Sequence, residues 1–421
     1  MRKYKLTFHS PSHSSAAKPP KRVTRQNLLL LVISLFCLAF VLFYPIGEFI
    51  RADELTQDEI QKEINESIDD QLGDLDFSSI EEVIKSLTSG QVELFGSTSF
   101  LSKLRSIITG EFADGSTSIW GALLSLVFDN LLKYLPIISS VIAIAIFGSM
   151  LQGLRPSNGK SISNVIHFVT YGMIVVILLS VVVKMVQMTG GVITNIKAQM
   201  DAIFPILLTL LTAIGGTVSV SVYQPAMALL TGTILNIFTY VLLPIFIFST
   251  IFSVVSNLSN SVKLDKFTSF FNSSYKWLIG LIFTIFSAFL SIQGIAAGSV
   301  DGISIRTAKY AIKSYVPILG SYLSDGLGII LASSNLIKNA VGAGGLILLL
   351  ATIAAPLIEL ILFMLTLKFI AGIVEPLGNG QVANFVSGLA KSMTLLISLI
   401  IGVAFVYFIM LGLIMCSANI I

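Results

Sequence analysis

The sequence has little charge, two cysteines and three histidines, and each scarcity excludes a class of protein. Only 12% of the 421 residues are charged and 54% are hydrophobic, whereas soluble domains carry about 25% charged residues. Two cysteines near opposite chain ends, Cys37 and Cys416, cannot build a disulfide framework or, with three scattered histidines, a Cys/His metal cluster. The composition is that of a polytopic membrane protein.

The few charges are unevenly placed along the chain. Residues 52–130 hold 16 acidic and 4 basic residues, whereas residues 135–421 hold 13 basic and 6 acidic ones. The formal net charge of +3 averages these regions and indicates no nucleic-acid-binding groove. The sequence also lacks a phosphate-binding loop and the His-Glu-x-x-His and Gly-x-Ser-x-Gly motifs. We therefore expect no enzymatic activity, no cofactor and no metal site.

The N-terminal part has the pattern of a segment that directs export. Residues 1–27 are basic and are expected in the cytoplasm, and residues 28–44 form an apolar run that suits either a signal peptide or a signal anchor. In both cases the positive flank stays inside, so residues 45–130 are expected on the far side of the membrane. Short apolar stretches at helical spacing in this acidic segment predict amphipathic helices.

Residues 131–421 are predicted to form a polytopic, all-α membrane domain with about 7 to 9 membrane-embedded helices. The run 226–256 contains Pro244 and fits either one long tilted helix or two short ones, and the glycine-containing run 318–334 is expected to re-enter rather than cross. The expected helices lie near 135–152, 164–186, 203–222, 226–256, 277–298, 341–368 and 390–416.

The membrane domain is predicted to contain an internal repeat, as opposed to a chance alignment of apolar stretches. A shift of 112 residues aligns Pro205 with Pro317 and Pro244 with Pro356, and a shift of 115 aligns Lys276 with Lys391. The repeat units are expected at about 164–265 and 277–380, followed by the terminal helix 390–416. An odd number of crossings per unit gives inverted copies and an even number gives parallel ones, and the sequence leaves both open.

Ionisable or strongly polar residues inside or beside apolar helices are the candidates for a polar pathway. Glu359 is the sharpest case, because a charged group at a helix centre costs about 2.5 to 3.5 kcal/mol on insertion scales and therefore needs a partner, water or a proton. It serves either a pathway or an internal pair with a basic residue such as Lys309 or Lys391. The complete candidate set is Gln293, Asp301, Arg306, Lys309, Asp325, Glu359, Glu375 and Lys391.

Several of these residues fall in stretches that resemble a known family. The most specific is 300–309, which contains Asp301, Arg306 and Lys309. The other stretches are 205–211, 215–216, 291–294, 316–320 and 375–380. Together they resemble the stage III sporulation protein AE family of endospore-forming bacteria, over about residues 130–420.

The resemblance implies a multi-pass protein of the mother-cell membrane that surrounds the forespore. It implies membership of the stage III A complex, a channel or feeding apparatus, with ring-forming members, a separate ATPase and the forespore protein Q as partners. The family member is permease-like, and a homo-oligomer and contacts with lipids are compatible with that role. The alternative hypothesis is a self-sufficient secondary transporter of a small solute.

Overall fold

The structure, a computed structural model, describes residues 57–96, 99–110, 116–153, 160–258, 264–297, 307, 309–312, 314–315, 320–377 and 380–417. This described part is helical and contains no strand, which confirms the predicted all-α class. Four short helices come first: α2 (Gln57–Asp74), α3 (Ser78–Lys85), α4 (Ser89–Phe95) and α5 (Phe100–Ile108). The long segments are α6 (Ser116–Gly153), α7 (Lys160–Ala213), the run from α8 (Thr217–Leu229) to α10 (Leu243–Leu258), α11 (Asp265–Ala297), α13 (Gly320–Val374) and α14 (Gly380–Cys416).

Six helical segments of the described part are long and apolar enough to cross a membrane. The predicted number was 7 to 9, and the apolar run 28–44 lies outside the described residues. The difference arises because segments predicted as separate helices are continuous. The chain is a helical membrane protein in which fewer, longer helices replace the expected set.

The helices predicted at 164–186 and 203–222 are one helix, α7, up to Ala213. The polar stretch between them stays helical because apolar residues recur on one face, where Val192, Ile196 and Met200 are buried at four-residue spacing. The chain turns where the second helix was expected to continue. Gly215 has φ +90, and the N–H of Gly216 donates to the carbonyl of Leu211, a glycine-dependent helix end.

The run 226–256 is one continuous helical segment, the first of the two alternatives that the sequence leaves open. Helices α8, α9 (Leu235–Ile237) and α10 are joined by π-helical turns at Leu230–Ile234 and Phe238–Leu242. A proline interrupts the i to i−4 ladder because it has no N–H and its ring crowds the carbonyl four residues earlier. A wider π turn just before the proline accommodates this defect without ending the helix.

The predicted re-entrant segment 318–334 is wrong for its described residues, which begin the 55-residue helix α13. Helix α13 continues to Val374 with Pro356 in its interior, and a 3₁₀ turn (Glu375–Leu377) follows. The glycines Gly326 and Gly328 did not break the helix, because a glycine lowers helix stability by only about 1 kcal/mol relative to alanine.

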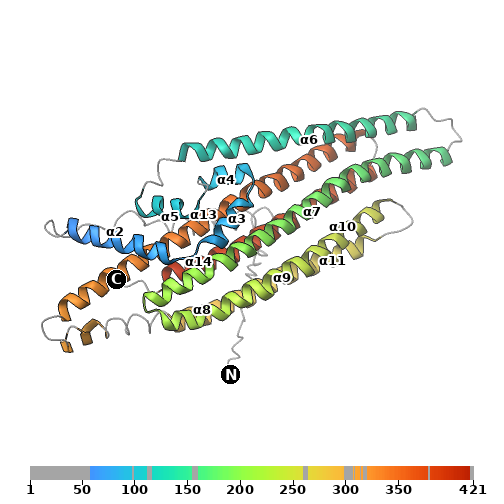
Figure 1. Cartoon of the computed structure of the whole chain (residues 1–421). Coiled ribbons are helices and arrows are strands. Elements are labelled where there is room, and N and C mark those ends of the chain that lie inside the picture. Colours follow the sequence, from blue (N-terminus) through green and yellow to red (C-terminus); the bar gives the residue numbers. More distant parts are fainter. Residues whose placement is uncertain are drawn as a thin grey trace, which may run out of the picture. The chain divides into compact units, whose positions relative to one another are not determined.

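Helix α14 is the central element of the bundle (Figure 1). In its apolar window 67% of the residues are buried, against 22% for α6 and for α11. Helices α7, α10 and α13 contact α14, and α6 packs on α7 and α13. The core of the molecule is therefore the region around α14 and its long antiparallel neighbour α13.

One end of the bundle, called here the loop end, is where α6, α10 and α13 end and α7, α11 and α14 begin. Ser149 of α6 donates to the carbonyl of Leu377 at 2.7 Å, and Tyr171 of α7 donates to the carbonyl of Val254 at 2.9 Å. The ring of Tyr171 also lies 5.4 Å from that of Phe385 in α14. These contacts join elements that are far apart in the sequence.

The bundle is longer than a membrane is thick. Helix α7 has 54 residues, so at 1.5 Å per residue it spans about 80 Å, whereas the hydrocarbon core of a bilayer is about 30 Å thick. Exposed large apolar side chains lie near the loop end on each outer long helix, for example Phe147, Val176, Trp277 and Phe369. This set, called the apolar belt, marks the part of the bundle suited to lipid.

Close packing of α6 on α7 depends on Gly148. A Cβ added there would lie 2.5 Å from the hydroxyl of Thr170 and 2.6 Å from its methyl group. Gly148→Val is expected to lower stability by about 1 to 3 kcal/mol through overpacking, read as a lower midpoint of thermal unfolding of the purified chain in detergent. Gly172→Val is the control, because a Cβ at Gly172 would meet nothing within 4 Å. Equal midpoints for the two variants would contradict the prediction.

Candidate functional site

A stripe of polar and small residues runs along one face of α13. Lys338, Gly345, Thr352 and Glu359 follow one another at seven-residue spacing, which places them on the same side of the helix. Lys338 and Thr352 have no exposed surface, Gly345 is buried and Glu359 is partly buried. The stripe faces the inside of the bundle over most of its length.

The centre of the stripe is a hydrogen-bonded group around Thr352. Gln199 of α7 donates through Nε2 to the Thr352 hydroxyl at 2.6 Å, and Gln91 of α4 donates through Nε2 to the Thr352 carbonyl at 3.0 Å. The Oε1 atom of Gln199 is fully buried and accepts no hydrogen bond within the described part of the chain. A buried polar atom without a partner costs about 1 to 3 kcal/mol.

Tyr407 of α14 supplies a second buried polar atom of this kind. Its hydroxyl has no hydrogen-bond partner among the residues that the structure describes, and the residue has no exposed surface. The hydroxyl lies 3.6 Å from the point where a Cβ of Gly345 would stand, and Ile203 lies 3.1 Å from the same point. Glycine at this position allows α13 to approach α7 and α14 closely.

Lys338 lies at the far end of the stripe from Glu359. Its ammonium donates to the carbonyl of Ser417 at 2.5 Å, where α14 has just ended, and the Ser417 hydroxyl bonds Tyr223 of α8 at 2.7 Å. A cation at a helix C-terminus meets the partial negative charge of the last carbonyls. Lys338 therefore holds the end of α14 against α13.

Glu359 is the one predicted candidate that joins the stripe. It lies in the half of α13 nearer the loop end, and Tyr134 of α6 donates to its backbone carbonyl at 3.4 Å. Lys391 of α14 is exposed and makes no ion pair with Glu359 in the described structure. Lys309 lies beside Gly328, about 45 Å along α13 from Glu359 at 1.5 Å per residue, so it is not the partner either.

Among the other predicted residues, the three whose side chains the structure describes, Lys309, Glu375 and Lys391, are not part of this stripe. Glu375 is exposed in the 3₁₀ turn at the loop end, and Lys309 is partly buried near the opposite end. Gln293 and Asp325 belong to α11 and α13, but their side chains lie outside the described set, as do Asp301 and Arg306 entirely. The pathway role of Glu359 and of the other candidates therefore stays a prediction.

We define the polar seam as Lys338, Thr352 and Glu359 of α13 with Gln199 and Tyr407. Sequence reasoning missed four of these five residues, because it ranked residues by charge and by position in an apolar run. The seven-residue spacing of Lys338, Thr352 and Glu359 was the available signal. Gln199 and Tyr407 had no such signal, since their burial is set by helices distant in sequence.

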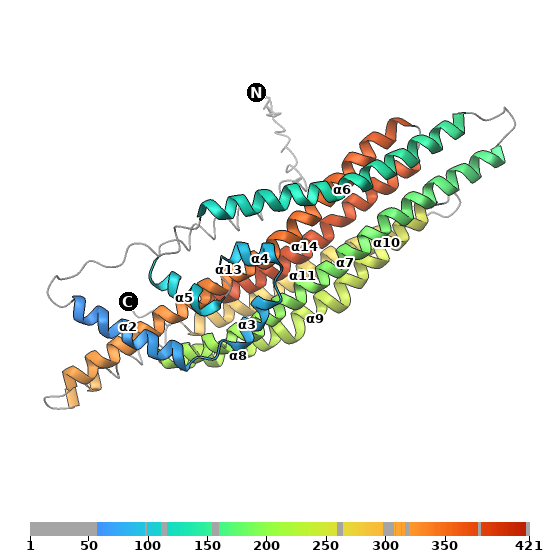
Figure 2. The same ribbon diagram turned by 45° about the horizontal axis from the view of Figure 1, so that its top comes forward.

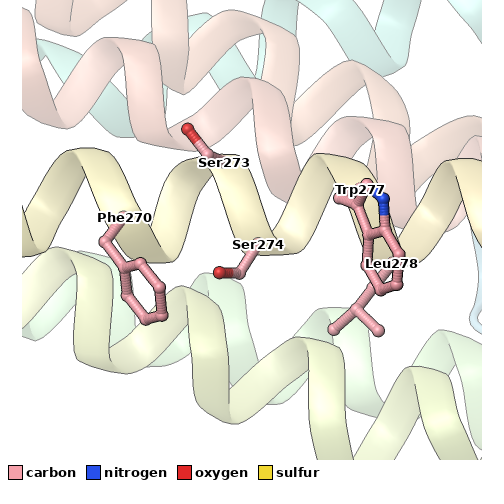
Figure 3. A pocket seen from close by; sticks show the side chains of 5 residues that line it. All are labelled: Phe270, Ser273, Ser274, Trp277 and Leu278. Carbon is pink, nitrogen blue, oxygen red and sulfur yellow. The ribbon is translucent and has the colours of Figure 1, made fainter.

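A wide hollow on the outside of α11 is a different kind of feature. It is lined by Phe270, Ser273, Ser274, Trp277 and Leu278, all from α11 (Figure 3). The hollow contains no ionisable group and lies in the apolar belt. It lacks the enclosure and convergent polar groups of a small-molecule site. The described residues also contain no group of three or more His, Cys, Asp or Glu that could hold a metal ion.

Lys103 of α5 is a buried charged residue outside the seam. Its ammonium lies 5.7 Å from the centre of the Phe95 ring, and burial lowers the pKa of Lys103 below its ordinary value of 10.5. Between the lowered pKa and 10.5, the unfolded segment binds more protons than the folded one. Stability therefore rises with pH in this window and is lost as the pH falls through the lowered pKa.

Helices α2 to α5 are accordingly expected to become more resistant to protease as the pH is raised toward 10.5. Lys103→Met removes the titrating group and keeps the apolar stem, so it is the control for the pH response of the protease itself. The measurement is the ratio of cleavage rates of the two proteins across the pH series. A ratio that does not change with pH would refute the assignment to Lys103.

The chain is similar to known proteins of one family. A sequence model of the family described as Stage III sporulation protein AE matches residues 98–418. The chain is 27% identical over 315 residues to Stage III sporulation protein AE of Bacillus subtilis (strain 168), which covers 73% of this chain and 79% of that protein. No solved structure matches the chain.

Proposed function

The chain belongs to the stage III sporulation protein AE family, and from this membership and the polar seam we propose that it is a membrane component of the mother cell to forespore channel. The family indicates a role in sporulation within the multi-protein stage III A complex, and the six apolar segments indicate a membrane protein. In the proposal, the bundle forms or gates a permease-like route along the seam. The separate ATPase, the ring-forming members and the forespore protein Q are the proposed partners.

The observation that carries the proposal is the burial of the hydrogen-bonded pair Gln199 and Thr352, and of Tyr407, inside the bundle. Two polar atoms of these residues, Gln199 Oε1 and the Tyr407 hydroxyl, are enclosed without a hydrogen-bond partner in the described structure. An apolar trio would fill a purely structural core without that cost. Water or a polar solute that passes along the seam would form hydrogen bonds with both atoms, so a route explains why these polar residues are buried there.

The proposed orientation places the loop end in the cytoplasm. The residues between α6 and α7 include Arg155, and those between α10 and α11 include Lys263, as expected for cytoplasmic connections. The short helices α3, α4 and α5 pack on α7, α6 and α13 farther from that end (Figure 2). With the apolar belt in the bilayer, the other half of the bundle stands in the space between the two membranes, within reach of ring partners.

The proposed repeat is supported by the helix boundaries. The shift of 115 residues moves the gap between α10 and α11, 259–264, onto 374–379, and it moves Asp265 at the start of α11 onto Gly380 at the start of α14. The run from α8 to α10 then corresponds to α13. Each proposed copy is a hairpin of two long helices and therefore has an even number of crossings. The proposed copies are accordingly parallel rather than inverted.

The experiment that tests the route uses the seam variants Thr352→Val and Gln199→Leu. Each is expected to reduce spore yield strongly at normal protein abundance, because it removes a polar group from the route and little volume. Thr212→Val and Gln224→Leu are matched controls, since both residues are exposed and lie near the end of the bundle opposite the loop end. Copurification with the other stage III A proteins shows whether assembly is intact. Normal spore yield in both seam variants would exclude the route.

A further inference from the structure

The exported helices cover the polar seam. Helices α4 and α5 contact α13, α3 contacts α7, and α4 also contacts α6 (Figure 2). We call α2 to α5 the lid. The lid reaches the centre of the seam directly, because Gln91 of α4 donates to the carbonyl of Thr352, and the hydroxyl of the same residue accepts from Gln199.

An aromatic pair provides the apolar part of this cover. Phe95 and Phe100 have no exposed surface, and their rings are parallel with centroids 6.5 Å apart. The ring of Phe100 lies 3.1 Å from the point where a Cβ of Gly344 would stand, and Leu104 lies 3.3 Å from it. Glycine at position 344 is what lets the lid sit this close to α13, one residue from Gly345 of the stripe.

The outer part of the lid is held by polar contacts. The hydroxyls of Ser67 in α2 and Ser333 in α13 are 2.8 Å apart, and Gln71 donates to Ser333 at 2.9 Å and accepts from Ser334 at 2.6 Å. Water can replace such hydrogen bonds at a modest net cost, about 0.5 to 1.5 kcal/mol each. Release of the α2 contact would break these hydrogen bonds and would also expose Ile68 and Leu72, which are buried on the same helix.

The closed arrangement encloses groups that water would stabilise, namely Gln199 Oε1 and the Tyr407 hydroxyl. A closed state that carries such a cost and is held in part by exchangeable hydrogen bonds has the properties of a two-state element. We propose that the lid is a movable plug that closes the polar seam, and that its release from α13 admits water to the Thr352 group. This inference rests on the proposed route, since it describes how that route is shut.

A disulfide between the lid and α13 tests the plug. Ser67→Cys with Ser333→Cys places two thiols where the hydroxyls are now 2.8 Å apart, close to the sulfur–sulfur bond length of about 2 Å, and an extracytoplasmic site favours its oxidation. The full chain is used, with Cys37 and Cys416 replaced by serine. Ser67→Cys with Ser333→Ala is the control, because it carries a thiol and cannot form the bond.

Two readouts follow. A third cysteine, Leu104→Cys, which is fully buried on the lid, is labelled with a water-soluble maleimide in isolated membranes. The oxidised lock is expected to slow labelling by about tenfold or more, since each 1.4 kcal/mol added to the opening free energy is tenfold. In sporulating cells, without the Leu104 change, the locked protein is expected to lower spore yield by a similar factor of about ten, and the control is not.

The outcomes separate the plug from the route. Slow labelling together with a spore yield that falls only in the locked protein supports the plug. A locked protein that sporulates normally while Thr352→Val does not would overturn the plug and leave the route standing. Labelling of Leu104→Cys at the same rate in the locked and control proteins would show that the lid does not open by release of α2, and would also overturn it. Normal spore yield with both Thr352→Val and Gln199→Leu would instead reject the route itself.

Discussion

Phe100→Ala is expected to lower the stability of the lid by about 3 to 5 kcal/mol, the usual cost of removing a buried aromatic side chain. Phe100 has no exposed surface and contacts Phe95, Phe77 and the glycine face of α13, so the cavity would lie at the lid interface. The open population would rise by about 100-fold or more, because each 1.4 kcal/mol is a factor of ten. Protease cleavage between residues 57 and 110 in isolated membranes measures this population.

Phe270→Ala is the matched control for Phe100→Ala. Phe270 is 62% exposed in the apolar belt, and its ring touches no part of the lid. Its truncation should leave cleavage of residues 57–110 unchanged. If Phe100→Ala is cleaved no faster than Phe270→Ala, the lid is not held by this aromatic packing.

Lys338→Ala is expected to destabilise the bundle by about 2 to 5 kcal/mol, by analogy with truncation of a buried long side chain. The change leaves a cavity between α13 and α14 and removes the donor to the Ser417 carbonyl. Lys338→Met keeps the volume of the aliphatic stem and removes the charge. Replacement of a buried charged residue by an apolar one of similar volume often leaves stability nearly unchanged. The midpoint of thermal unfolding in detergent separates the two variants.

The comparison of Lys338→Ala with Lys338→Met also tests what the lysine is for. If the lysine serves mainly to pack between α13 and α14, Lys338→Met should recover most of the stability that Lys338→Ala loses. A defect in spore yield that persists in Lys338→Met would show that the function needs the positive charge. A Lys338→Ala protein as stable as the unchanged one would contradict the assigned contact with Ser417. The exposed Lys391→Ala is the control for the loss of a lysine as such.

The membrane class and the all-α fold followed from composition, because 54% hydrophobic residues with few charges fit only apolar helices in this length of chain. The helix boundaries did not follow. Windowed hydropathy separates 164–186 from 203–222, but α7 continues between them because buried Val192, Ile196 and Met200 keep one apolar face. A span-by-span interpretation assumes helices about as long as the bilayer is thick, and these helices are longer.

The seam was predicted only at Glu359, for a physical reason. A carboxylate in an apolar run is recognisable from one stretch of sequence, whereas Gln199 becomes notable only when α7 is packed against Thr352 of α13. Tyr407 likewise reads as an ordinary aromatic residue of α14 until its hydroxyl is found buried without a partner in the described part of the chain. Uncharged polar residues acquire a role from tertiary contacts, which a single sequence does not contain.

Solvent accessibility along α13 tests the central claim most directly. Single cysteines at Thr352 and Glu359 would be treated with a small water-soluble thiol reagent in membranes from sporulating cells, with Leu365→Cys in the apolar belt as the lipid-facing comparison. A polar route along α13 predicts that these two seam cysteines react when the stage III A complex is assembled and that Leu365→Cys does not. Seam cysteines that stay unreactive in the assembled complex, while their proteins are present and correctly inserted, would contradict a polar route through this bundle.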